Sequence, residues 1–170
     1  MKETAYISLA TAETSEEFDP AAMGVACVAV LFDGTVYYFE EDELGRLYDL
    51  LERVERLVGV NDFVVRALEE QGLDTTTYDF DFIGIQSVVS DTAGVRVSFN
   101  NITTSTFGEE RTDPIQIPLE WQSGNEETVK RALKKDVTLL SQLDEKLRGD
   151  GYVWITDPQT MEERKVSIFG

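Results

Sequence analysis

The chain contains no histidine, and this absence excludes several kinds of chemistry. Without an imidazole there is no serine–histidine triad, no histidine metal ligand and no histidine general base. Cysteine is nearly absent as well, because Cys27 in the apolar run GVACVAVLF is the only one. Neither an intrachain disulfide nor a cysteine zinc cluster can form, and Cys27 is expected to fill the core. Any catalysis must therefore depend on carboxylates.

Basic residues are scarce: 15 lysines and arginines, six of them lysines, face 33 acidic residues and give a net charge of -18. A field of this sign repels phosphate backbones at long range and opposes non-specific binding of nucleic acid. An acidic surface with few lysines is also typical of proteins adapted to high intracellular salt, where screening weakens self-repulsion. A halophilic source is one expectation from this composition.

Long apolar runs are absent too, and no segment approaches the length of a membrane span. The first residues, MKETAYISLATAET, lack the apolar core of a signal peptide. We therefore expect a soluble, cytoplasmic protein with no membrane partner. A chain of 170 residues without repeats or linkers predicts one domain over residues 1–170.

A helical period is clearest near the C-terminus. The apolar positions that recur there at spacings of three and four are Val129, Leu133, Val137, Leu140, Leu143 and Leu147. This pattern predicts a helix that buries one face. Ser123 with Glu126 resembles a capping box, Asn125 is a second candidate cap, and Gly149 to Gly151 supplies the stop.

Asp136 breaks the pattern, because at 100° per residue it lies inside the apolar stripe. A buried charge is costly unless it is paired, hydrogen-bonded or bound to a metal. Two interpretations stay open. The carboxylate is satisfied by a backbone amide or an arginine, or it is a metal ligand that a helix presents to a neighbouring strand, as in Mg²⁺-dependent nucleases.

The rest of the chain predicts a mixed α/β order. Three antiparallel strands are expected over 6–11, 24–32 and 35–40, with a tight turn at Asp33-Gly34. The apolar content of the second strand predicts a central position in the sheet. A helix capped by Asp42, a strand in LVGVN, a helix in DFVVRALEEQG, and a short strand running into a helix over 75–94 follow. Ser98 caps a further helix, Pro114 and Pro118 mark a loop, and a hairpin turned at Asp157-Pro158 closes the chain.

The segment KRALKKDVTLLSQLDEKLRGDGYVW resembles the third exonuclease motif and following hairpin of the DnaQ-like (DEDD) 3'-5' exonucleases, in the branch found beside helicases. That family has the ribonuclease H-like fold, with a mixed sheet flanked by helices. In the branch, a Tyr-x3-Asp motif places the last metal-binding aspartate on this helix. The matching positions are Ala132 and Asp136, so the aspartate is present and the tyrosine is not. The resemblance implies catalysis with Mg²⁺ or Mn²⁺.

The other metal-binding positions of the family are altered. Its first strand supplies Asp-x-Glu, and the aligned positions hold Ser8 and Ala10. The nearest acid, Glu13, lies beyond the expected end of the strand and could substitute only if the strand continued with a bulge. Otherwise Glu13 is a surface acid.

The second motif of the branch, Gly-[Phe/Tyr]-Asn followed by Phe-Asp, is matched at Gly59, Asn61 and Phe63, but Val64 stands where the aspartate should be. Asp62 is adjacent and displaced, and the interpretation we prefer for it is the N-cap of the next helix. Tyr78 and Asp79 lie where the family has a further aspartate, but ordinary turn roles explain them as well.

One carboxylate cannot hold two metal ions. We therefore expect a degenerate exonuclease-like domain that is catalytically inactive, binds no metal tightly, and acts as a scaffold or as a module for nucleic acid or a nucleic-acid-processing protein. The basic cluster available for nucleic acid comprises Lys130, Arg131, Lys134 and Lys135. Such a charge run is also typical of a solvated helix face.

Two alternatives remain. One is a metal-dependent 3'-5' exonuclease with a rearranged site built from Asp136, Asp62, Glu13 and Asp79. The other is an acidic protein-interaction module with no nucleic-acid role, which uses aromatics of the closing hairpin. Its candidate apolar patch comprises Tyr152, Trp154, Ile155 and Phe169.

Overall fold

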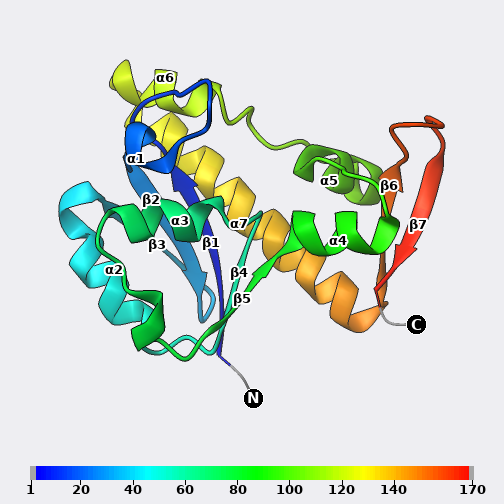
Figure 1. Cartoon of the computed structure of the whole chain (residues 1–170), viewed down its shortest axis with the longest axis horizontal. Coiled ribbons are helices and arrows are strands. Elements are labelled where there is room, and N and C mark those ends of the chain that lie inside the picture. Colours follow the sequence, from blue (N-terminus) through cyan, green and yellow to red (C-terminus); the bar gives the residue numbers. More distant parts are fainter. Residues whose placement is uncertain (1–2, 169–170) are drawn as a thin grey trace.

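A mixed five-stranded sheet forms the centre of the computed structural model, which describes residues 3–168 (Figure 1). The strands lie in the order β3-β2-β1-β4-β5. Their bounds are β1 Thr4–Ala10, β2 Cys27–Phe32, β3 Thr35–Glu40, β4 Arg56–Gly59 and β5 Asp81–Gly84. The first three strands are antiparallel, whereas β4 and β5 run parallel to β1. The expected mixed sheet and its antiparallel opening are confirmed.

The turn between β2 and β3 has the predicted chemistry. Asp33 and Gly34 both have positive φ, 51° and 77°, as the right-handed twist of a two-residue hairpin requires. The predicted central position of the second strand needs a small correction. β2 is an interior strand, but β1 holds the centre because β4 pairs with its other edge.

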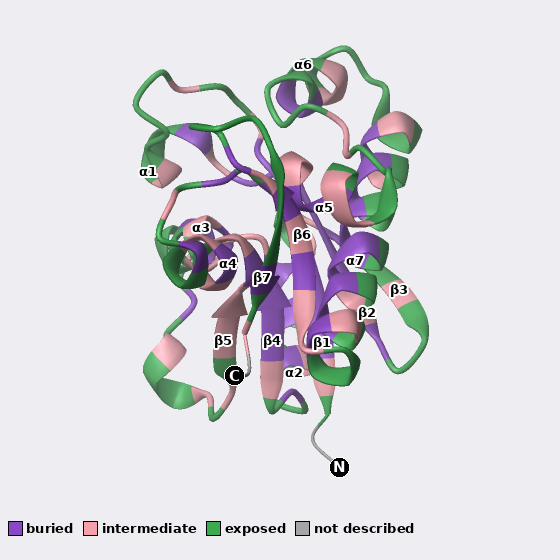
Figure 2. Cartoon of the chain, turned by 90° about the vertical axis from the view of Figure 1, so that its right-hand side faces the viewer, coloured by how far each residue is buried: buried purple, intermediate pink, exposed green. Residues whose placement is uncertain are grey.

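Helices cover both faces of the sheet. The bounds are α1 Pro20–Met23, α2 Leu44–Leu51, α3 Phe63–Glu70, α4 Ile85–Ala93, α5 Phe99–Phe107, α6 Gln116–Gln122 and α7 Glu126–Gly149, with 3-10 turns at Glu41–Glu43 and Thr75–Thr77. The long helix α7 crosses one face, where α4 and α5 share its apolar core. Helices α2 and α3 bury their apolar sides on the opposite face. Figure 2 shows the buried strands enclosed between these layers.

The alternation of β1 decides which of its side chains meet α7. Ala5 and Ile7 belong to the core under α2 and α3. Tyr6 and Ala10 belong to the core under α7, and Ser8 lies between them in the same register. Successive side chains of a strand point to opposite faces, so Tyr6 and Ser8 both face α7.

The predicted helix caps were mostly wrong in detail. Ser123 Oγ donates to the Leu119 carbonyl, so it serves α6 rather than capping α7. Asn125 occupies the N-cap position of α7 without a side-chain capping bond. Asp42 lies inside a 3-10 turn that precedes α2, where Glu43 accepts from the Glu40 amide instead. Ser98 does cap α5, since its Oγ accepts from the Asn101 amide at 3.0 Å.

The proline-marked loop is partly helical. Pro118 lies in the first turn of α6, where a missing amide proton costs nothing because that amide has no helical partner. The closing hairpin is confirmed as β6 Tyr152–Thr156 and β7 Glu163–Ser167. It packs on α5, where Thr106 Oγ1 bonds both the Trp154 carbonyl and the Trp154 amide at 3.0 Å. Within residues 3–168, no helix has the length and apolar content needed to cross a membrane.

Candidate functional site

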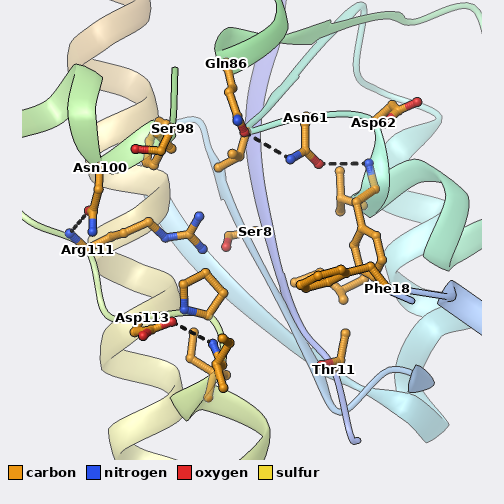
Figure 3. Close-up of a pocket in the computed structure, with 18 of the residues that line it drawn as sticks. Ser8, Thr11, Phe18, Asn61, Asp62, Gln86, Ser98, Asn100, Arg111 and Asp113 are labelled. Atoms are coloured by element: carbon orange, nitrogen blue, oxygen red, sulfur yellow. Dashed lines mark hydrogen bonds between the residues drawn. The ribbon is translucent and has the colours of Figure 1, made fainter. Parts of the chain in front are cut away.

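An open cleft of about 1680 Å³ lies where the parallel strands β1, β4 and β5 end (Figure 3). In open α/β sheets the carboxyl ends of parallel strands are where ligands commonly bind, since loops and helix N-termini converge there. The polar side chains at its centre are Ser8, Thr11, Asn61, Gln86, Ser98, Asn100 and Arg111.

Asn61 and Gln86 join the ends of β4 and β5. Asn61 Nδ2 donates to Gln86 Oε1 at 3.2 Å, and its Oδ1 accepts from the Phe63 amide at 3.0 Å. Gln86 Nε2 in turn donates to the Val97 carbonyl at 3.0 Å. Asn61 therefore stabilises the turn between β4 and α3. The lack of a side chain at Gly84 lets the end of β5 pack closely against Asn61, because a Cβ at Gly84 would lie 3.1 Å from Asn61 Cα.

Asp136 is 1% exposed and does not itself line the cleft, but it bonds two residues that do. Its Oδ2 accepts from Ser8 Oγ at 2.8 Å and from Arg111 Nη2 at 2.8 Å. Of the two interpretations drawn from the sequence, the structure supports the carboxylate satisfied by an arginine. The residue expected to hold a metal is engaged by a fixed cation.

Arg111 reaches Asp136 from the loop between α5 and α6. Its backbone amide donates to Asn100 Oδ1 at 2.8 Å, and its guanidinium lies 5.5 Å from the Phe99 ring centroid. The side chain is 12% exposed, so the pair with Asp136 is largely shielded from water. Within the described residues, Arg111 Nε and Asp136 Oδ1 are buried without a hydrogen-bond partner.

Burial governs the protonation of Asp136. Desolvation raises the pKa of this carboxyl above its usual range, although the positive charge of Arg111 and the Ser8 hydroxyl oppose the rise. The net direction is upward because the desolvation of this buried carboxyl outweighs the opposing interactions.

A second buried carboxylate, Asp144, lies two turns further along α7 and was missed by the sequence analysis. It is 1% exposed and accepts from Tyr6 at 2.8 Å and from both Arg56 Nη atoms at 2.6 and 2.5 Å, while Arg148 lies 3.2 Å away. Burial would raise the pKa of Asp144, but the bonds from Arg56 and Tyr6 outweigh it and lower that pKa. Burial, and then the bond to Asp144, raises the pKa of Tyr6 to about 12.

The sequence contains a signal for Asp144. It lies four residues after Leu140 and three residues before Leu147, so the helical spacing places it on the same buried face of α7.

The remaining family positions bear no metal-binding groups. Ala10, Val64 and Ala132 are buried hydrocarbon side chains, and Ser8 is a neutral hydroxyl. A divalent cation at Asp136 would also meet the positive charge of Arg111. No group of three or more acidic, cysteine or histidine side chains that could hold a metal occurs within residues 3–168. The donor set therefore does not fit a two-metal centre of the kind that the resemblance implies.

The other predicted acids are dispersed. Asp62 lines the cleft, but its side chain is 75% exposed and lies 4.0 Å from Arg66, without the predicted capping bond. Glu13 is exposed beyond the end of β1 and is not among the residues that line the cleft. Asp79 precedes β5 and therefore lies at the opposite end of the sheet. The rearranged carboxylate site is not formed by these residues.

The predicted basic cluster lies on α7, outside the cleft. Lys130 is partly buried with its ammonium 5.9 Å from the Tyr38 ring centroid, and Lys135 lies 3.6 Å from Glu109. Arg131 and Lys134 are exposed, as a solvated helix face predicts.

The hairpin aromatics do not form the expected apolar patch. Ile155 is fully buried, and the Tyr152 ring contacts the ammonium groups of Lys146 and Lys165, which lie 4.3 and 4.0 Å from its centroid. Trp154 is partly buried beside that ring. Phe169 lies outside the described residues.

Comparison with known proteins adds evidence on the fold alone. No protein-family model and no curated protein matches this chain. Among solved structures it is similar to the family B DNA polymerase from the hyperthermophilic archaeon Pyrobaculum calidifontis, with a TM-score of 0.65 and 18% identity. The match covers 87% of this chain and 25% of the polymerase chain, so the chain spans about a quarter of that protein. With its mixed sheet, flanking helices and closing hairpin, the chain has a ribonuclease H-like α/β fold.

Proposed function

We propose that this chain is a degenerate exonuclease-like domain that does not cleave phosphodiester bonds and acts as a scaffold for a partner in nucleic-acid processing. The observation that carries the proposal is the Ser8–Asp136–Arg111 cluster. Two-metal cleavage needs several carboxylates around two divalent ions, and a guanidinium beside the retained aspartate supplies charge of the wrong sign.

The charge of the cleft supports a role other than hydrolysis of nucleic acid. Its lining carries five carboxylates against three guanidinium groups, and one of these guanidiniums, that of Arg111, is neutralised by Asp136. A phosphate backbone would be repelled there unless divalent ions or high salt intervened.

Calorimetric titration with Mg²⁺ and Mn²⁺, at low and at molar salt, tests the proposal. We expect no tight binding by the wild type, and no cleavage of single-stranded DNA or RNA in either ion. Asp136→Asn serves as the diagnostic variant, because it keeps the volume of a buried side chain, and Asp62→Asn is the matched control on the exposed rim.

Mn²⁺ binding that is lost in Asp136→Asn and kept in Asp62→Asn would contradict the proposal, and metal-dependent cleavage with the same dependence would restore the exonuclease alternative. Circular dichroism on each variant separates loss of binding from loss of fold.

A further inference from the structure

The cleft exposes apolar side chains that a soluble domain normally buries. Phe18, in the loop between β1 and α1, is 59% exposed, and Ile115, just before α6, is 55% exposed. The Phe18 ring extends into the cleft (Figure 3). Phe18 also has φ of 52°, a left-handed conformation that bulky residues rarely adopt. Exposed apolar groups at a concave surface are typical of binding sites.

The rim of the cleft is acidic. Its carboxylates, all exposed, are Glu16, Asp62, Asp91, Glu110 and Asp113. They come from the loop after β1, the start of α3, helix α4 and the loop before α6, and they line the same cleft as Phe18 and Ile115. Three arginines share the lining. Arg111 is paired with Asp136 and Arg66 lies 4.0 Å from Asp62, which leaves Arg96 against Glu16, Asp91, Glu110 and Asp113, so the lining keeps a negative excess.

The size of the cleft limits its occupant. At about 1680 Å³ and open to solvent, it exceeds the roughly 300 to 1000 Å³ typical of small-molecule sites. An elongated chain fits this space better than a compact ligand, and an acidic rim disfavours a nucleic-acid strand.

We propose that this cleft binds a short peptide segment of a partner protein, in which apolar side chains are flanked by lysines or arginines. The apolar side chains cover Phe18 and Ile115, and the basic side chains meet the rim carboxylates. The net charge of -18 steers such a segment toward the domain. This inference rests on the proposed scaffold function and names the chemistry of its partner.

A displayed library of random peptides of about twelve residues, selected on the full chain, is the probe. We expect enrichment of peptides that combine Lys or Arg with Leu, Ile or Phe. Their affinity, measured by fluorescence anisotropy, should fall about tenfold or more in Phe18→Ser/Ile115→Ser. The rim variant Asp91→Asn/Glu110→Gln should weaken binding mainly at low salt.

Matched controls are Tyr37→Ser/Met161→Ser, which removes exposed apolar groups elsewhere, and Glu145→Gln/Glu163→Gln, which removes two remote charges. Both controls should bind as the wild type does. No enrichment, enrichment of acidic or wholly polar peptides, or binders indifferent to the Phe18 and Ile115 changes would overturn the inference. So would displacement of the peptides by a single-stranded oligonucleotide. The calorimetric metal titration is independent, so failure of this inference and failure of the scaffold proposal are distinguishable.

Discussion

Arg111 Nη2 lies 2.8 Å from Asp136 Oδ2, although Arg111 belongs to a loop and Asp136 to the middle of a helix. This contact ties the segment between α5 and α6 to α7 and fixes one wall of the cleft. It also places a positive charge beside the carboxylate that, by resemblance, would otherwise face metal ions.

The Arg111–Asp136 pair should be costly to break from one side only. Asp136→Leu or Arg111→Met alone leaves a buried, unpaired charge and should lower the free energy of unfolding by about 3 to 5 kcal/mol. The double variant Asp136→Leu/Arg111→Met removes both charges and should be clearly more stable than either single variant. Urea denaturation measures all three.

An exposed ion pair supplies the control for this comparison of single and double variants. Lys135 and Glu109 lie 3.6 Å apart with side chains about half exposed, so removing either should change stability by no more than about 1 kcal/mol. Additive losses in the double variant at Asp136 and Arg111 would contradict a coupled buried pair.

The two buried carboxylates of α7 should contribute to stability with opposite pH dependence. The pKa of Asp136 is raised in the folded state, so its contribution is present below the unfolded value of about 3.9 and is lost as pH rises through the folded pKa. The pKa of Asp144 is lowered, so its contribution is present above about 3.9 and is lost as pH falls through the folded pKa.

Denaturation of Asp136→Asn and Asp144→Asn from about pH 3 to pH 7 checks these signs. The stability that the wild type has over Asp144→Asn should grow with rising pH, whereas its stability relative to Asp136→Asn should shrink. Equal slopes for the two variants would show that the environments of the two carboxylates do not differ as the structure indicates.

The Tyr6 hydroxyl should stabilise the fold measurably, because it donates to the ionised Asp144 inside the core. Tyr6→Phe should lose about 1.5 to 3 kcal/mol, the range for a hydrogen bond to a charged group. Tyr37→Phe, on a ring that is 40% exposed, should be nearly neutral. Ultraviolet titration should also show one tyrosine ionising near pH 12, and that step should disappear in Tyr6→Phe.

A carboxylate pair should be recoverable at the position of Ser8. Ser8 Oγ lies 2.8 Å from Asp136 Oδ2, so Ser8→Asp/Arg111→Gln would place two carboxylates together without the competing cation. Without divalent ions their repulsion should destabilise the protein. Saturating Mn²⁺ should raise the melting temperature, with about 2.7 kcal/mol of stabilisation at one hundred times the dissociation constant.

The isosteric variant Ser8→Asn/Arg111→Gln is the control for this design and should not respond to Mn²⁺. The wild type should not respond either. A wild-type response equal to that of the designed variant would mean that Arg111 does not exclude the ion.

The sequence by itself determined the elements that have a clear period. Apolar content and turn chemistry placed β1, β2 and β3, and the three-and-four spacing of apolar residues placed α7 with Asp136 inside its buried face. These features depend on neighbours within one element, so they can be read locally. The same reasoning, applied to Leu140 and Leu147, would have found Asp144.

Only the tertiary structure decided what those buried carboxylates meet. Arg111 lies 25 residues from Asp136 along the sequence, in a loop without periodicity, and Arg56 lies 88 residues from Asp144. No local sequence pattern therefore predicts either pair. The cleft likewise arises because β1, β4 and β5 end side by side, which brings Phe18 and Ile115 to one opening. The sequence determined that Asp136 is buried; the packing of a distant loop determined that its partner is an arginine.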